Sequence, residues 1–305
     1  MEQHALPAYA ELPVGDDLPP GSSWGVWSDH DVLGTLNLLT PERVVAAAHS
    51  IRTGRTFGLN LDLTLPDPPL FGRASFRHEV TDERNSVHDD IYHAWNTQAS
   101  SQWDGFRHLG HRDHGHYGGV ADEDHGVHHW AARGIVGRAV LADVDRWRGA
   151  QGRPLRQGEP DPISADDLRA CLTAQGTAVE TGDVLLVRTG YLTWYRSLDR
   201  AGREAHAASP QTPGLAGGDV PGVLWDLHVS AIASDNPAVE VIPPGRPFLH
   251  TMLLPLLGLP LGELWDLDAL ADDCAAVATY DAFFTSAPLN MPGGVATPPN
   301  AIAIR

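Results

Sequence analysis

Apolar and polar positions alternate in several distinct patterns along the chain, beginning with a helical one. Residues 39–54, LTPERVVAAAHSIRTG, are typical of a helix, because Thr40 can cap its amino end and Pro41 suits its first turn. Residues 56–65 alternate apolar and polar side chains, which predicts a half-buried strand. Residues 66–95 are polar and follow no period, so we expect them to be irregular.

Two short runs rich in valine and leucine follow in the middle of the chain. Residues 134–144 and 182–190 are bounded by glycine, and each run predicts a buried strand. The stretch between them, 164–176, is typical of a helix with Ser164 as its amino-terminal cap and Gly176 after its last turn.

The last third of the chain continues this mixture of helices and strands. Residues 222–236 predict a strand that ends in a polar turn, 264–277 predict a helix, and 278–285 predict a strand. No internal repeat or low-complexity linker interrupts the pattern. We therefore expect one α+β domain over 24–305, preceded by an arm at 1–23 in which proline and glycine break any periodicity.

Composition and charge exclude several classes of protein. The 305 residues are 42% hydrophobic and 20% charged, as in ordinary globular domains. No apolar run approaches the ~20 residues of a membrane span, and the amino-terminal stretch lacks the features of a signal peptide, so we expect a cytoplasmic protein. The formal net charge of −18 disfavours nucleic acids and anionic membranes as partners and leaves a small-molecule substrate.

Residues 96–119, NTQASSQWDGFRHLGHRDHGHYGG, hold the densest group of side chains that could carry chemistry. Four polar residues of this stretch are spaced by two, so an extended strand would place them on one face. They are Gln98, Ser100, Gln102 and Asp104. Such a row lines either solvent or a site, and the spacing alone favours neither.

His108 follows Asp104 by four residues, and this pair is the sharpest candidate for catalysis. The carboxylate could hold a metal ion while the imidazole, with a pKa near neutrality, moves a proton. Nearby histidines are more typical of surface or core positions: His111, His114, His116, His125, His128 and His129. The neighbouring aromatic residues could line a pocket or pack in the core: Trp95, Trp103 and Phe106.

The stretch QASSQWDGFRH (98–108) resembles the signature His-x-Gly-Thr-His-x-Asp-x-x-x-His of the cyclase family of metal-dependent hydrolases, which includes bacterial kynurenine formamidase and isatin hydrolase. The family's metal-binding aspartate corresponds to Asp104, and its acid/base histidine corresponds to His108. Its two leading histidines correspond to Gln98 and Gln102. The chain therefore resembles a long variant of the family that is marked by SQWDG.

Further blocks resemble the same family in the same order along 24–305. They are GTLNLLTPERVVAAA, RGIVGRAVLADV, GDVLLVRTG, VSAIASDNPAVEV and the tail GGVATPPNAIAI. The block FLHTMLLPLLGLPLGELWDLDALA resembles the region where the family keeps a histidine and a downstream acidic or amide residue near the metal. These positions are His250 and Glu263 here.

The resemblance implies a swivelling β/β/α fold, with a mixed sheet or barrel and peripheral helices. It also implies a homodimer or homotetramer, with an amino-terminal arm that crosses to a partner subunit. The implied ligands of a divalent metal are Gln98, Gln102, Asp104, His250 and Glu263. Because most of these ligands offer oxygen, they suit Mn²⁺ or Mg²⁺ better than tetrahedral Zn²⁺. The predicted metal is Mn²⁺ or Zn²⁺.

The implied reaction is hydrolysis of an amide, lactam or lactone bond by a metal-activated water. His108 would act as acid/base, and His250 would either ligate the ion or stabilise an oxyanion, so both are catalytic candidates. Two alternatives stay open. The same residues could serve a lyase, dehydratase or cyclase that depends weakly or not at all on metal and acts on a natural-product intermediate, or the chain could be a binding protein that keeps only the fold.

Overall fold

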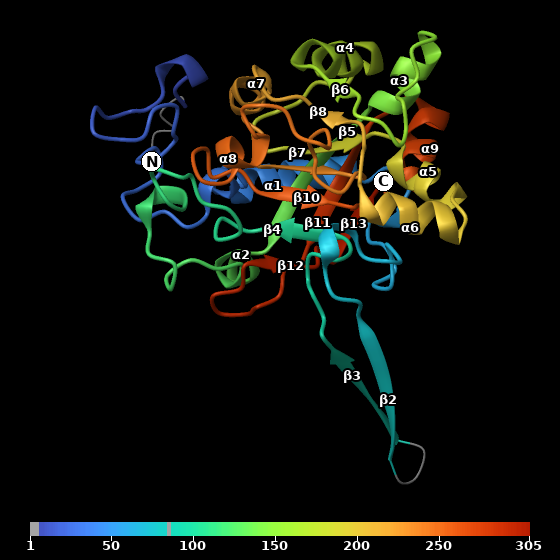
Figure 1. The fold of residues 1–305 in the computed structure, drawn as a ribbon. Helices are drawn as coiled ribbons and strands as arrows, with labels where there is room; N and C mark the ends of the chain where they lie inside the picture. Colours follow the sequence, from blue (N-terminus) through green and yellow to red (C-terminus); the bar gives the residue numbers. More distant parts are fainter. Residues whose placement is uncertain (1–5, 84–86) are drawn as a thin grey trace.

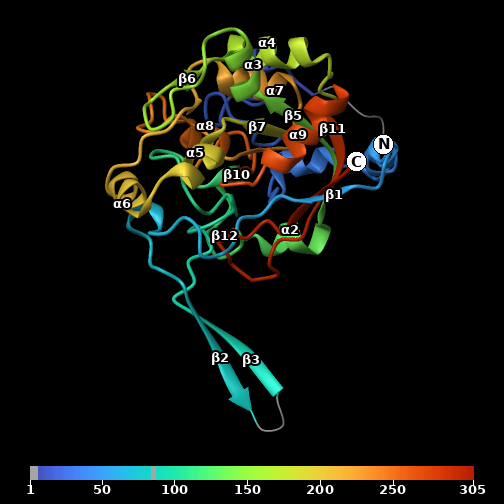
Figure 2. The same cartoon turned by 90° about the vertical axis from the view of Figure 1, so that its right-hand side faces the viewer.

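The computed structural model describes residues 6–83 and 87–305, so the first five residues of the predicted arm lie outside it. A curled sheet of nine strands occupies the centre, with helices packed around it (Figure 1). A two-stranded hairpin projects away from this body in both views (Figure 2). The predicted α+β class is confirmed.

Thirteen strands and nine α-helices make up the regular structure of the described residues. The strands are β1 Thr56–Gly58, β2 Arg77–Glu83, β3 Val87–His93, β4 Gln102–Asp104, β5 Ile135–Asp143, β6 Pro162–Ile163, β7 Val184–Arg188, β8 Gly214–Leu215, β9 Ala231–Ser234, β10 Leu261–Glu263, β11 Asp281–Ser286, β12 Ala296–Thr297 and β13 Ala301–Ile304. The helices are α1 Pro41–Ala47, α2 His128–Arg133, α3 Val144–Ala150, α4 Ala165–Gln175, α5 Tyr191–Ser197, α6 Arg200–Ala208, α7 Val220–Asp226, α8 Leu249–Leu253 and α9 Asp268–Val277.

The large sheet has the strand order β1-β13-β11-β5-β7-β9-β10-β4-β12. Its centre, β5-β7-β9-β10, is parallel, and the strands on either side of that centre pair antiparallel. The parallel strands therefore end at one common edge of the sheet. That edge is where charged side chains gather, as described below.

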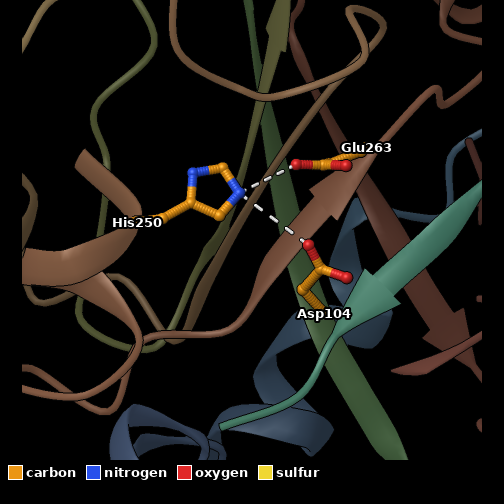
Figure 3. A group of neighbouring side chains, drawn as sticks. All are labelled: Asp104, His250 and Glu263. Carbon is orange, nitrogen blue, oxygen red and sulfur yellow. Dashed lines mark hydrogen bonds and ion pairs between the residues drawn. The ribbon is translucent and has the colours of Figure 1, made fainter. Parts of the chain in front are cut away.

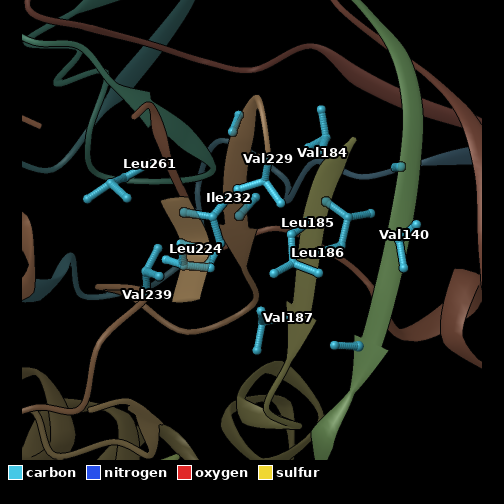
Figure 4. Close-up of a cluster of buried hydrophobic side chains, with 14 of the residues drawn as sticks. Val140, Val184, Leu185, Leu186, Val187, Leu224, Val229, Ile232, Val239 and Leu261 are labelled. Atoms are coloured by element: carbon cyan, nitrogen blue, oxygen red, sulfur yellow. The ribbon is translucent and has the colours of Figure 1, made fainter. Parts of the chain in front are cut away.

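The core of the molecule lies on the central parallel strands, as the apolar runs predicted. Every residue of β7 and β9 is buried, and Figure 4 shows their side chains packed with those of β5 and α7. Parallel strands covered on both faces read as continuous apolar runs because neither face meets water. Each buried valine or leucine side chain contributes roughly 1.5–3 kcal/mol, so these strands form the rigid frame of the site.

The helix predicted at 164–176 is confirmed with its caps. The Ser164 hydroxyl accepts a hydrogen bond from the Asp167 amide at 3.0 Å, and Gly176 adopts the left-handed conformation after the last turn. The helix predicted at 39–54 begins correctly at Pro41, after the Thr40 cap, but α1 ends at Ala47. The chain tightens there into a 3-10 turn at 48–50.

Two predicted strands are shorter than their patterns suggested. The strand expected over 56–65 is regular only in β1, and beyond it Asn60 forms an isolated bridge with Trp265. The stretch 222–236 begins inside α7, and only β9 is a strand. The strand expected within this stretch is thus confirmed in β9. Apolar runs of this length suit a buried helix as well as a strand, so the pattern alone did not separate α7 from β9.

The expectation that 66–95 is irregular is wrong, because β2 and β3 form the projecting hairpin. They pair antiparallel from Arg77 opposite His93 to Glu83 opposite Val87. Most described side chains of both strands are exposed. A strand without a buried face has no reason to alternate apolar and polar residues, so the period that identifies strands was missing.

The described part of the predicted arm packs against its own chain. Trp225 of α7 donates its indole N–H to the carbonyl of Pro7 at 2.8 Å, and the Tyr9 amide donates to Asp226 at 2.8 Å. The boundary between arm and domain, and the homodimer or homotetramer, stay predictions. Within 6–83 and 87–305 no helix has the length and apolar character needed to cross a bilayer.

Candidate active site

Three elements from distant parts of the sequence bring the predicted acids and histidine together. Asp104 is the last residue of β4, Glu263 is the last residue of β10, and His250 lies in α8. The two strands pair antiparallel with Glu263 opposite Gln102. Because directly paired residues share a face, as do residues two apart on one strand, the side chains of Gln102, Asp104 and Glu263 all leave the sheet on one side.

The side chains of Asp104, His250 and Glu263 converge in the interior (Figure 3). His250 Nε2 lies 3.0 Å from Glu263 Oε1 and 3.8 Å from Asp104 Oδ2. One ligand atom from each of the three residues lies within 4.8 Å of the other two. A nitrogen and two carboxylate oxygens at this spacing make a candidate site for a divalent metal.

The two glutamines that replace the family's histidines border this cluster. Gln102 donates its amide to Glu263 Oε2, and its own carbonyl oxygen is buried without a partner. Gln98 donates to Asp104 Oδ1 at 2.7 Å, and the same nitrogen lies 2.9 Å from His108 Nδ1. Both amides therefore reach the cluster, and the side-chain oxygen of Gln102 is fully buried without a partner.

His108 lies at the more open side of the cluster. Its Nε2 is 3.6 Å from Asp104 Oδ2, and its side chain is 26% exposed, whereas that of Asp104 is 1% exposed. Partial burial lowers the pKa of His108, and the positive charges of His250 and Arg73 lower it further, although Asp104 opposes them. A histidine with this pKa is neutral near pH 7 and can accept a proton.

Glu240 is a buried part of the site whose role the sequence alone did not identify. Its carboxylate accepts the backbone amides of Leu249 at 2.9 Å and His250 at 3.2 Å, and also the Nδ1–H of His250. This contact turns Nε2 of His250 toward the cluster. The available signal was a glutamate between two valines, Val239 and Val241, a few residues after the buried strand β9.

The ionisation of the cluster reflects burial and crowding of negative charge. Burial, together with the nearby charge of Asp104, raises the pKa of Glu263 to about 7. Burial alone would also raise the pKa of Asp104, yet its contacts with His250, His108 and Gln98 lower it overall. Burial alone would lower the pKa of His250, but three surrounding carboxylates raise it well above its ordinary value. Without a metal, a proton retained on His250 therefore offsets part of the negative charge of the cluster.

Other predicted residues lie outside the cluster. The row of four polar residues on one strand face is wrong, because 97–101 form turns and bends before β4 begins; the Ser100 hydroxyl donates to the carbonyl of Asp62 at 3.1 Å. Trp103 and Phe106 are buried in the core. His125 is also structural, because its Nε2 bonds the Tyr117 carbonyl at 2.8 Å.

Comparison with known proteins identifies a family for the chain. The family model described as "Putative cyclase" matches residues 41–241. The crystal structure of a novel cyclase is 31% identical, superposes with a TM-score of 0.83, and covers 93% of this chain and 99% of its own. No curated protein matches the chain.

More distant relatives share the fold. Isatin hydrolase A from Ralstonia solanacearum is 17% identical, with a TM-score of 0.61, over 87% of this chain and 98% of its own. Isatin hydrolase A from Labrenzia aggregata, bound to benzyl benzoate, is 16% identical, with a TM-score of 0.58, over 86% and 97%. The protein belongs to the cyclase family, and the fold expected from the resemblance is the fold it has.

Proposed function

We propose that the protein is a metal-dependent hydrolase of an amide, lactam or lactone bond. One observation carries the proposal: Asp104, His250 and Glu263 converge in the interior, and two buried oxygens there have no hydrogen-bond partner, Asp104's own Oδ2 and the Oε1 of the adjoining Gln102. Buried acceptors are nearly always satisfied in folded proteins. Buried negative charge that has no counter-charge is costly. Two buried acceptors without partners beside the Glu263 carboxylate are therefore better explained by a bound cation than by a site that stays empty.

The donor set indicates which cation the residues would hold. Asp104, Glu263 and Gln102 would supply oxygen, and His250 would supply nitrogen through Nε2. An oxygen-rich set favours Mn²⁺ over Zn²⁺, which prefers nitrogen and sulfur. Gln98 stays a predicted ligand, because its amide nitrogen is the atom that contacts Asp104.

A bound divalent ion would polarise a carbonyl and make a nearby water more acidic. The remaining steps are assigned to residues of the chain. His108, neutral near pH 7, takes the proton of the attacking water and returns a proton to the leaving nitrogen or oxygen. Glu240 holds the ring of His250 in one orientation, so that its Nε2 faces Asp104 and Glu263.

The relatives suggest the first substrates to test. Proteins described as isatin hydrolases share this fold, and isatin is a cyclic amide. Formanilide adds a simple open-chain aryl amide. The purified protein should bind Mn²⁺ and hydrolyse one of these classes, and a chelator should abolish turnover until Mn²⁺ is restored.

Variants separate the metal site from the acid/base. We expect Asp104→Asn to lose Mn²⁺ binding and turnover together. We expect His108→Gln to keep Mn²⁺ while kcat falls by about 10²–10⁴-fold. His114→Gln is the matched control, because His114 is an exposed histidine of the same loop.

Two outcomes would reject the hydrolase. Turnover of a substrate by elimination or cyclisation, unaffected by a chelator but lost in His108→Gln, would establish the lyase or cyclase alternative. Absence of both metal binding and turnover, with small-molecule binding retained, would establish a binding protein.

A further inference from the structure

Arg73 is an arginine beside the candidate site with no acidic partner. The sequence has 39 acidic residues for 21 arginines, and most described arginines form ion pairs. Among the described side chains, no carboxylate oxygen lies within 4.0 Å of a nitrogen of Arg73, since none of those pairs includes it. Other described arginines, among them Arg43 and Arg133, also form no ion pair, so the position of Arg73 beside the candidate site is the informative feature.

The backbone before Arg73 fixes where its side chain reaches. A tight 3-10 turn at Leu70–Gly72 precedes it, with the left-handed conformation at both Phe71 (φ 57°) and Gly72 (φ 67°). The guanidinium carbon lies 5.3 Å from the centre of the Phe71 ring. An aromatic face holds an arginine in place and leaves the edge of its planar fork free for hydrogen bonds.

Arg73 reaches the same segment that carries Gln98. One terminal nitrogen of its guanidinium donates to the backbone carbonyl of Gln98. The side chain of Gln98 in turn contacts Asp104 at 2.7 Å and His108 at 2.9 Å. Arg73 therefore lies one residue away from the candidate metal ligand and the candidate acid/base, on the more open side of the cluster.

The positive charge of Arg73 influences the pKa of two residues in the cluster. Burial is the main cause of the lowered pKa of His108, and the positive charge of Arg73 adds to it. Burial and Asp104 raise the pKa of Glu263, and Arg73 opposes them. The same positive charge thus acts on the acid/base and on a buried carboxylate, although it forms an ion pair with neither.

We propose that Arg73 binds a carboxylate of the substrate, so that the site takes an amide or lactam that also carries this anionic group. This proposal rests on the proposed hydrolase function. An arginine fork matches a carboxylate with two parallel hydrogen bonds, which neutral analogues cannot reproduce. In a chain of net charge −18, a local unpaired cation also offsets the repulsion that an anionic substrate would otherwise meet.

Binding of benzoate and of benzamide to the Mn²⁺-loaded protein tests the proposal without turnover. The two probes have nearly the same shape and differ in charge. We expect Arg73→Gln to weaken benzoate about tenfold or more and to leave benzamide within twofold, with Arg73→Lys in between. Arg169→Gln, which removes an exposed arginine of α4, should change neither affinity.

Kinetics supplies the second measurement. Formanilide and 2-formamidobenzoate share the cleaved bond, and only the latter has a carboxylate. We expect Arg73→Gln to raise KM for 2-formamidobenzoate about tenfold or more and to leave its kcat and both constants for formanilide unchanged. If neither isatin nor either formamide is hydrolysed, the hydrolase proposal fails while the benzoate measurement still decides the role of Arg73.

Three results would overturn the assignment. Benzoate that binds Arg73→Gln as tightly as the unaltered protein is held elsewhere, for example by the metal alone. If Arg73→Gln weakened the binding of benzoate and of benzamide equally, Arg73 would have a structural role. A loss of thermal stability that Arg73→Lys does not recover would lead to the same conclusion. Absence of measurable benzoate binding to the unaltered protein would exclude a carboxylate subsite.

Discussion

Two clusters of buried and partly buried carboxylates lie at the same edge of the sheet, and a different cation offsets the negative charge of each. Asp143 and Arg188 are the last residues of β5 and β7, and Glu263 is the last residue of β10. The first cluster surrounds Arg188, whose nitrogens lie 2.9–3.1 Å from Asp143, Asp145 and Asp268. The second surrounds His250 with Asp104, Glu240 and Glu263.

The difference lies in the cation at the centre. Burial works to lower the pKa of Arg188, but the surrounding aspartates raise it, so its charge is permanent. His250 is positive only while it holds a proton. A histidine can give up that proton and offer a lone pair to a metal, whereas an arginine cannot. The first cluster is therefore a closed structural unit, and the second can exchange a proton for a divalent cation.

The largest expected effect comes from removing the permanent cation. Arg188→Gln leaves several carboxylates without a counter-charge, and we expect the free energy of unfolding to fall by about 3 kcal/mol in urea titrations. The control Arg169→Gln breaks an exposed pair and should change it by less than about 0.5 kcal/mol. A fully stable Arg188→Gln protein would mean that the two clusters do not differ in this way.

Glu263→Gln removes a carboxylate from the second cluster, where Arg188→Gln removes the cation from the first. The raised pKa means that the folded protein holds the Glu263 proton more tightly than the unfolded chain does. The resulting stability is present below pH 4.5 and is lost as the pH rises through about 7. At pH 8 without metal the ionised carboxylate is a net cost, so we expect the neutral amide to maintain or raise the free energy of unfolding.

The next effect is stabilisation by metal. At about 100 times its dissociation constant, Mn²⁺ should raise the free energy of unfolding by about 2.7 kcal/mol. The increase should persist in Arg188→Gln and disappear in Asp104→Asn, because only the second cluster takes up the ion. Urea unfolding with and without Mn²⁺ measures both. An equal increase in Asp104→Asn would place the ion elsewhere.

A smaller effect is expected from the residue that orients His250. Glu240→Gln keeps an acceptor for Nδ1–H but removes its charge, and we expect Mn²⁺ affinity to fall by about 10–100-fold in calorimetric titrations. Asp268→Asn, from the first cluster, is the matched control and should leave the affinity unchanged. If the two variants behaved alike, Glu240 would have no special role.

The last expected effect is the pH dependence of metal binding. His250 must lose its proton to ligate, and Glu263, with a pKa of about 7, must lose its own. Mn²⁺ affinity should therefore rise with pH between 6 and 8, by about tenfold per pH unit for each proton released. An affinity independent of pH over this range would contradict the proton-for-metal exchange.

Local patterns predicted much of the fold. The α4 helix was correct to its caps, because Ser164 and Gly176 act on neighbouring backbone groups. Strands β5 and β7 were correct because their apolar runs are buried on both faces. The hairpin β2–β3 was missed because neither of its faces packs against a core, so no alternation was required of its sequence.

The candidate site was predicted in part. The family resemblance assigned Asp104, His108, His250 and Glu263, and these four lie together. Glu240 was missed because its role depends on α8, whose chain returns to within a hydrogen bond of it. Arg73 was missed because nothing near it in the sequence indicates that its turn faces the segment of Gln98.

The sequence by itself determined the caps, the buried parallel strands and the set of residues that resembles the cyclase signature, because each depends on neighbours along the chain. Only the tertiary structure decided which buried carboxylates meet an arginine and which meet a histidine. Strand register and the approach of α8 set those pairings across gaps of tens to more than a hundred residues. Opposite charges neutralise each other only when they lie close together in space, and the packing of the fold sets the distances between them.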